Sequence, residues 1–287
     1  MGWVTTGDAA AFLAAAGSFL RAERARNTVL LTVTETAIAD PSYYAGETEP
    51  DKGPLFGWWT AGDGAVGGAF LHTPPFPVLP TAMPLAAAAE LAAKTLAGRP
   101  VAGVNAYAQV ATAFAATWAD ATGAQVSVHR RMRLYRLDGL VWPDPVPAGG
   151  PRTAGDDEAA LLTDWVTAFA SEVHETEGAD HAAAVRERLS YGGLTLWETD
   201  DEPVSLAGFT RRVAGMVRIG PVYTPPRLRG HGYASAATAE VSRAALAAGA
   251  DEVLLYTDLA NPVSNAIYQR IGYREVEDRV VLSFTGQ

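Results

Sequence analysis

The hydrophobic positions in the second half of the chain first follow the period of a helix. In Asp156–Val173, apolar residues stand at 161, 162, 165, 166 and 169, which places them on one helical face. A polar stretch follows, and a second, shorter helix is expected at His181–Leu189. The pattern therefore predicts that two helices open this half.

Three segments rich in β-forming residues come next. Turn residues separate them, and together they favour an antiparallel meander of strands at Leu194–Thr199, Pro203–Arg211 and Gly215–Thr224. Within the third strand, Gly220-Pro221 suggests a bulge that would splay the sheet.

Helices and strands alternate in the rest of this half. A long helix is expected to end near Ala248, where Gly249 supplies its cap. A second helix begins at Asn261-Pro262, with Asn as N-cap and Pro in the first turn. The strands expected after these helices are Glu252–Thr257 and Arg274–Phe284.

The first half has a similar order of elements. The pattern predicts a hairpin at Gly57–His72, a helix at Leu85–Leu96, a strand at Val101–Asn105, a helix at Val110–Trp118 and a strand at Val126–Leu137. We interpret the shared order as an internal duplication whose sequences have diverged.

A proline- and glycine-rich segment separates the two halves. Residues 141–151 (VWPDPVPAGGP) cannot continue a helix or a central strand. We therefore expect one domain at 1–140, a linker at 141–151 and a second domain at 152–287.

The amino-acid composition of the chain argues against several classes of function. The net charge is −10, which argues against general nucleic-acid binding, because that needs a basic face. The chain has no cysteine, which excludes a disulfide framework, cysteine metal sites and a thiol nucleophile, and its five histidines show no metal-ligand spacing. With no membrane-length apolar run and no signal-peptide pattern, we expect a cytoplasmic protein without a metal or a membrane partner.

The clearest chemical motif is Arg227-x-x-Gly230-x-Gly232, between an expected strand and the long helix. Glycines let the backbone turn tightly and approach a ligand, and the first N–H groups of the helix attract an anion. The pattern fits a phosphate cradle. The alternative is an ordinary glycine-containing turn, because a single GxG is common.

A second motif follows in the helix that begins at Asn261. Asn265 and Tyr268 are three residues apart, so they share one face of that helix. The amide could hold a cofactor arm and the phenol could stand near a leaving group. Alternatively, Tyr268 is a half-buried core residue.

Together, the two segments resemble the GNAT superfamily of acyl-CoA-dependent N-acyltransferases. The first resembles its pyrophosphate-binding motif, and NPVSNAIYQRIGY (261–273) resembles the helix that follows. The resemblance implies an α/β (α+β) fold with a mixed sheet: two GNAT-like domains in tandem, each a mostly antiparallel splayed sheet flanked by helices. The first domain would be degenerate, because Thr73–Pro84 carries no GxG.

The resemblance also implies roles for individual residues. The CoA phosphates would meet the backbone amides and arginines of the loop, the pantetheine arm would meet the preceding strand and the Asn helix, and Tyr268 would protonate the departing thiolate. The implied cofactor-binding residues are Val222, Tyr223, Arg227, Leu228, Arg229, Gly230, His231, Gly232, Tyr233, Asn261 and Asn265.

The general base is less clear from the sequence. Some members of the superfamily place a glutamate on the strand before the loop, but Met216–Tyr223 carries no carboxylate. The candidates are Glu172 and His174, in the segment that borders the acceptor site in GNAT-like folds; a histidine between carboxylates would have a usable pKa. The alternative is that this segment is only a solvated helix end.

The acceptor pocket is poorly specified, and Trp165 or Trp197 could line it. We expect a monomer or homodimer that transfers an acetyl group from acetyl-CoA directly to a primary amine of a small molecule. Two alternatives stay open: a protein or peptide N-acetyltransferase, and a non-catalytic acyl-CoA-binding protein.

Overall fold

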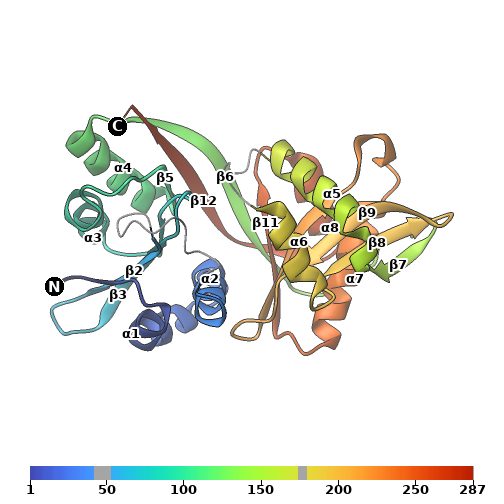
Figure 1. The fold of residues 1–287 in the computed structure, drawn as a ribbon, viewed down its shortest axis with the longest axis horizontal. Helices are drawn as coiled ribbons and strands as arrows, with labels where there is room; N and C mark the ends of the chain where they lie inside the picture. The colour runs from blue at the N-terminus through green and yellow to red at the C-terminus, as the bar shows by residue number, and fades with distance from the viewer. Residues whose placement is uncertain (42–52, 174–179, 287) are drawn as a thin grey trace. The chain divides into compact units, whose positions relative to one another are not determined.

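A computed structural model describes residues 1–41, 53–173 and 180–286. The chain forms two compact units, one of residues 1–132 with 277–287 and the other of residues 133–276. Figure 1 shows the course of the chain. Two long strands belong to both units: β6 (Gln125–Leu137) begins in the first and ends in the second, whereas β12 (Tyr273–Thr285) runs the opposite way.

The second unit is built on a mixed sheet. Its strands lie in the order β12-β6-β11-β10-β9-β8-β7. Strands β7 to β10 pair antiparallel with their neighbours, and β10 pairs parallel with β11. The bounds are β7 Gly150–Thr153, β8 Leu194–Thr199, β9 Glu202–Phe209, β10 Met216–Tyr223 and β11 Glu252–Asp258.

Helices cover both faces of this sheet. Helices α5 (Ala159–Glu172) and α6 (His181–Leu189) lie side by side on one face (Figure 1) and pack on Leu194, Leu196 and Leu206. Helix α7 (Tyr233–Ala247) packs on the opposite face, on Val204, Ala207 and Val217. Helix α8 (Pro262–Arg270) joins that second core through Tyr268. Successive residues of a strand point to opposite faces, so Leu206 and Ala207 serve different cores.

The first unit contains a four-stranded sheet in the order β1-β2-β3-β4. Its core also holds residues of α3, α4, β5 and β12. The bounds are β1 Gly2–Thr6, α1 Ala9–Ala22, α2 Thr28–Ala39, β2 Leu55–Thr60, β3 Val66–His72, β4 Leu79–Pro80, α3 Leu85–Glu90 continued by a π-helical turn at Leu91–Thr95, β5 Gly103–Ala106 and α4 Ala108–Thr122.

The elements expected from the hydrophobic pattern are present, with small shifts at their ends. The pattern made no prediction for β1, α1 and α2. The segment expected as a linker, 141–151, falls inside the second unit, and its last two residues start β7. Among the described strands, β8 is the one neighbour of this edge strand, which therefore tolerates Pro151. The mixed α/β fold class is confirmed.

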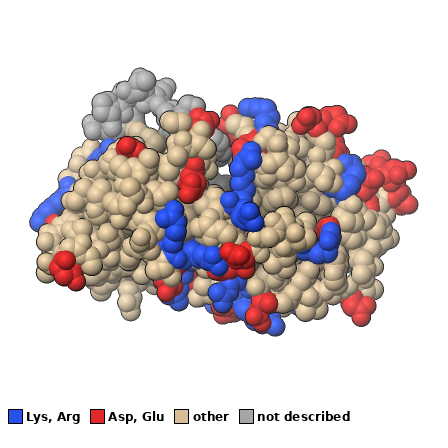
Figure 2. Space-filling model, turned by 90° about the horizontal axis from the view of Figure 1, so that it is seen from below, with Lys and Arg blue, Asp and Glu red and all other residues tan. Residues whose placement is uncertain are grey.

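Charged side chains of both signs are interspersed on the surface. On the face shown in Figure 2, basic and acidic groups adjoin one another. Arg136 and Glu252, both in the second unit, form an ion pair at 3.7 Å. None of the helices that the structure describes has the length and apolar character needed to cross a membrane.

Candidate active site

Strand β10 parts from its parallel neighbour at its C-terminal end. The pairing with β11 runs from Met216 opposite Glu252 to Ile219 opposite Leu255. Beyond a register shift between Ile219 and Val222, β10 stays paired with β9, through Val222 and Tyr223. The irregularity falls at Gly220-Pro221, where the sequence predicts a bulge. Because β10 leaves β11 at this point, its main-chain N–H and C=O groups on that side are left for a ligand to pair with.

The loop after β10 leads into a helix without a side-chain cap. A 3-10 turn at Pro226–Leu228 is followed by Gly230 and Gly232, whose φ angles are +85° and +84°. These left-handed values favour glycine. Gly232 is the N-cap of α7 and has no side chain to bond the first N–H groups, whereas Asp180 and Asn261 cap α6 and α8 with theirs. The start of α7 thus offers backbone donors and a helix dipole to an anion.

Arg229 is held in place at the end of β10. Its Nε donates to the Thr224 carbonyl at 2.8 Å, and its guanidinium lies 5.9 Å from the centre of the Tyr223 ring. Its Nη2 contacts both carboxylate oxygens of Glu172, at 2.7 Å each. Two residues for which the sequence predicted separate roles are therefore partners. Arg227 lies nearby in the loop with an exposed side chain.

A buried hydroxyl pair supports the start of the loop. Ser205 on β9 donates to the Tyr223 carbonyl at 3.1 Å and bonds the Thr224 hydroxyl at 2.8 Å. These bonds fix the main chain at the point where Arg229 bonds Thr224. Sequence reasoning missed this pair, because no local pattern shows that Ser205 faces the end of β10.

The other residues assigned to the loop and its strand lie around this point. The exposed His231 stacks on Tyr233, with ring centroids 5.6 Å apart, and Leu228 and Val222 pack partly against the core under α7. Trp165 on α5 contacts Tyr223, with ring centroids 6.0 Å apart, so it lies beside the end of β10. Trp197 is only 2% exposed and donates its Nε1–H to the Ala148 carbonyl.

The side chain of Asn265 makes three hydrogen bonds within the protein. Its Nδ2 donates to the carbonyls of Asp258 and Asn261, at 2.8 and 2.7 Å. Its Oδ1 accepts from the hydroxyl of Tyr135 on β6, at 3.0 Å. Both amide hydrogens are used, so a bond to a ligand would fall to the remaining lone pair of Oδ1. Asn261 caps α8 through its Oδ1.

Tyr268 lies at the boundary of the core under α7, with 8% of its surface exposed. Burial raises the pKa of its phenol to about 12, and a hydrogen bond with Ser264 lowers that pKa slightly. The hydroxyl therefore keeps its proton at neutral pH and can donate it. Its ring meets that of Tyr273 in an edge-on contact.

The two base candidates end up in different situations. Glu172, the last residue of α5, is ion-paired with Arg229. His174 lies outside the described residues.

In the first unit, the strands at the same place in the element order, β4 and β5, belong to different sheets, and the space between their ends is filled. Val78 pairs parallel with Val104 of β5. Past that point, Nη2 of Arg279 on β12 donates to the carbonyls of Pro80 and Asn105, at 3.0 and 2.6 Å. The Arg279 side chain is 3% exposed, so the space between the strand ends is filled.

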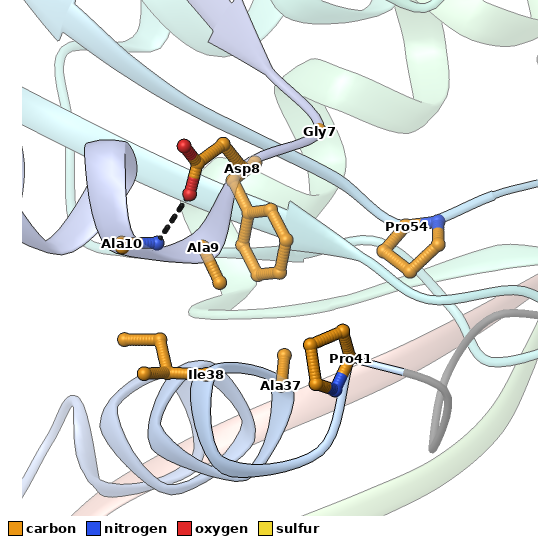
Figure 3. A pocket seen from close by; sticks show the side chains of 9 residues that line it. Gly7, Asp8, Ala9, Ala10, Ala37, Ile38, Pro41 and Pro54 are labelled. Atoms are coloured by element: carbon orange, nitrogen blue, oxygen red, sulfur yellow. Dashed lines mark hydrogen bonds between the residues drawn. The ribbon is translucent and has the colours of Figure 1, made fainter.

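A shallow hollow in the first unit offers little chemistry. Figure 3 shows it between the start of α1 and the end of α2, lined mostly by alanine, isoleucine, proline and phenylalanine side chains. Its carboxylate, that of Asp8, already accepts from the N–H groups of Ala10 and Ala11. No group of three or more potential metal ligands gathers anywhere in the described parts of either unit.

A family model for the acetyltransferase (GNAT) family matches residues 159–273, from the start of α5 to the start of β12. The match covers the part of the chain from α5 to the start of β12, and it supports an acyl-transfer activity. No curated protein matches the chain.

Solved structures extend the likeness in fold to the whole length. A Drosophila protein aligns over 99% of this chain and 98% of its own, with a TM-score of 0.67 and 13% identity. A GNAT-family acetyltransferase from Colwellia psychrerythraea covers 100% of both chains, with a TM-score of 0.59 and 11% identity. A GCN5-related N-acetyltransferase from Sphaerobacter thermophilus covers 99% and 95%, with a TM-score of 0.58 and 17% identity. Identities this low concern the fold alone.

Proposed function

We propose that this chain transfers an acetyl group from acetyl-CoA to a primary amine of a small molecule. The observation that carries the proposal is the uncapped start of α7, behind two left-handed glycines and beside the freed end of β10. The acidic net charge of −10 fits a soluble acceptor better than a polyanionic one.

The residues present fit a CoA-type ligand. The amides from Leu228 to Tyr233 would meet the pyrophosphate, with Arg227 and Arg229 beside it. The open edge of β10 at Val222 and Tyr223 would pair with the pantetheine amides, and Oδ1 of Asn265 on α8 would bond the same arm. Bound there, acetyl-CoA supplies a thioester whose carbon is open to attack by an amine.

The chain's own groups would serve both ends of the transfer. As the C–N bond forms and the C–S bond breaks, the thiolate needs a proton, and the phenol of Tyr268 holds one at neutral pH. A backbone N–H near Val222 would stabilise the thioester oxygen. The proton that the amine loses would pass to water or to Glu172 once that carboxylate is free. We further propose one cofactor per chain, because Arg279 fills the corresponding gap of the first unit.

A Tyr268→Phe variant tests the assignment of the acid. We expect turnover to fall by roughly a hundredfold or more, because general acid catalysis commonly contributes 10²–10⁴-fold. The affinity for CoA should be unchanged, because the ring stays in place. Tyr273→Phe is the matched control, since Tyr273 bonds Ser242 within the core. Unchanged turnover in Tyr268→Phe would remove Tyr268 as the acid, and binding without turnover in the wild type would favour the non-catalytic alternative.

A further inference from the structure

The carboxylate of Glu172 is paired with Arg229, an arginine of the loop proposed to bind phosphate. Both of its oxygens lie 2.7 Å from Nη2 of Arg229. Carboxylates and phosphates are recognised by the same planar donors of a guanidinium. The partner of Arg229 in this structure is therefore an anion of the kind that the loop is proposed to bind.

Arg229 has contacts other than its pair with Glu172. The bond from Nε to the Thr224 carbonyl and the contact with the Tyr223 ring come from the end of β10 itself. Ser205 holds that main chain from the other side. These contacts would hold the arginine while one anion is exchanged for another.

Glu172 is free to leave the pair. It is the last residue of α5, and both side chains of the pair are about half exposed, at 47% and 45%. Exposed ion pairs contribute little to stability, commonly under about 1 kcal/mol. A phosphate ester carrying more negative charge, and assisted by the amides of α7, can displace such a carboxylate.

We propose that Glu172 is an internal competitor for the phosphate site: its carboxylate and the phosphates of acyl-CoA bind Arg229 in turn. This inference rests on the proposed function. Without cofactor, the pair ties the end of α5 to the loop. When cofactor binds, the carboxylate is released and repels the phosphates that replaced it. Glu172 therefore lowers the affinity for phosphate-bearing donors.

Equilibrium binding to the full chain tests the proposal. The ligands are acetyl-CoA and acetylpantetheine, which carries the thioester and the amides but no phosphate. We expect Glu172→Gln to bind acetyl-CoA about two- to fivefold more tightly, a size set by exposed ion pairs, and acetylpantetheine as the wild type does. In an Arg229→Gln background, Glu172→Gln should have a much smaller effect, because the shared arginine is gone.

A second exposed pair provides the matched control. Glu187 contacts Arg211 at 3.0 Å, with side chains 37% and 57% exposed. Glu187→Gln should leave the affinity for acetyl-CoA unchanged. Thermal melting within a few degrees of the wild type would show that each variant is folded.

Each outcome separates the two claims. If Glu172→Gln binds acetyl-CoA equally or more weakly, or changes acetylpantetheine affinity just as much, the competition is overturned while the proposed function stands. If the wild type binds neither ligand at millimolar concentration, the proposed function itself is overturned.

Discussion

At the scale of single residues, His72 shows how burial couples charge to folding. The side chain at the end of β3 is 1% exposed, and among the described residues its Nδ1 has no hydrogen-bond partner. Burial, reinforced by the charge of Arg99, lowers the pKa of its imidazole from 6.5 to about 4. The folded chain therefore holds His72 neutral at pH values where the unfolded chain protonates it.

This lowered pKa predicts a pH-dependent stability. The contribution of neutral His72 to the free energy of unfolding is complete above pH 6.5. It decreases by up to about 3 kcal/mol as the pH falls toward 4. Urea unfolding at pH 7 and pH 5 should show a smaller difference for His72→Gln than for the wild type. His129→Gln, at an exposed position on β6, is the control. An equal pH dependence in wild type and His72→Gln would contradict the argument.

At the scale of elements, three segments meet at Asn265. The side chain joins the end of β11, the start of α8 and Tyr135 of β6. The helix and its cap could be predicted from Asn261-Pro262, because capping is local. The partner Tyr135 could not, because it lies 130 positions away and the contact depends on how β6 enters the sheet. Likewise, the sequence predicted Arg229 and Glu172 separately but not their pairing.

The three bonds predict the cost of removing Asn265. Asn265→Ala should lower the free energy of unfolding by about 2–3 kcal/mol, since each bond contributes about 1 kcal/mol and Tyr135 loses a buried acceptor. Denaturant unfolding measures this. Gln269→Ala removes a bond to the same Tyr135 hydroxyl from an exposed side chain, so its loss should stay near 1 kcal/mol or below. Equal losses of unfolding free energy in the two variants would contradict the inference that Asn265 holds these three elements together.

At the scale of the whole molecule, the boundary between the two compact units does not fall at residues 141–151, the clearest break in the sequence. Prolines and glycines at 141–151 are a local signal, and they predict domains at 1–140 and 152–287. The compact units instead share two strands, because residues 133–137 lie in the second unit and 277–287 in the first. No local pattern shows where a strand finds its partners. By contrast, the elements from α5 to α8 follow periodicity and capping and could be predicted, and the fold class was implied by the resemblance of two short motifs to a known family.

A fragment experiment tests this division. Residues 152–287 alone would lack the end of β6, which neighbours β11, and would carry an unpaired end of β12. We expect this fragment to be unfolded or aggregated, by circular dichroism and size-exclusion chromatography, while the full chain is folded. A monomeric fragment 152–287 that melts cooperatively and binds acetyl-CoA like the full chain would contradict the shared-strand organisation.

The central claim is that the start of α7 holds the phosphates of an acyl-CoA. A calorimetric titration of the full chain with acetyl-CoA, repeated with Gly232→Val, tests it most directly. Valine at a φ of +84° is strained and would cover amides at the helix start. The account predicts saturable binding of one acetyl-CoA per chain by the wild type, and a loss of at least tenfold in affinity in the variant. No binding by the wild type at millimolar acetyl-CoA, or equal binding by a folded Gly232→Val, would contradict it.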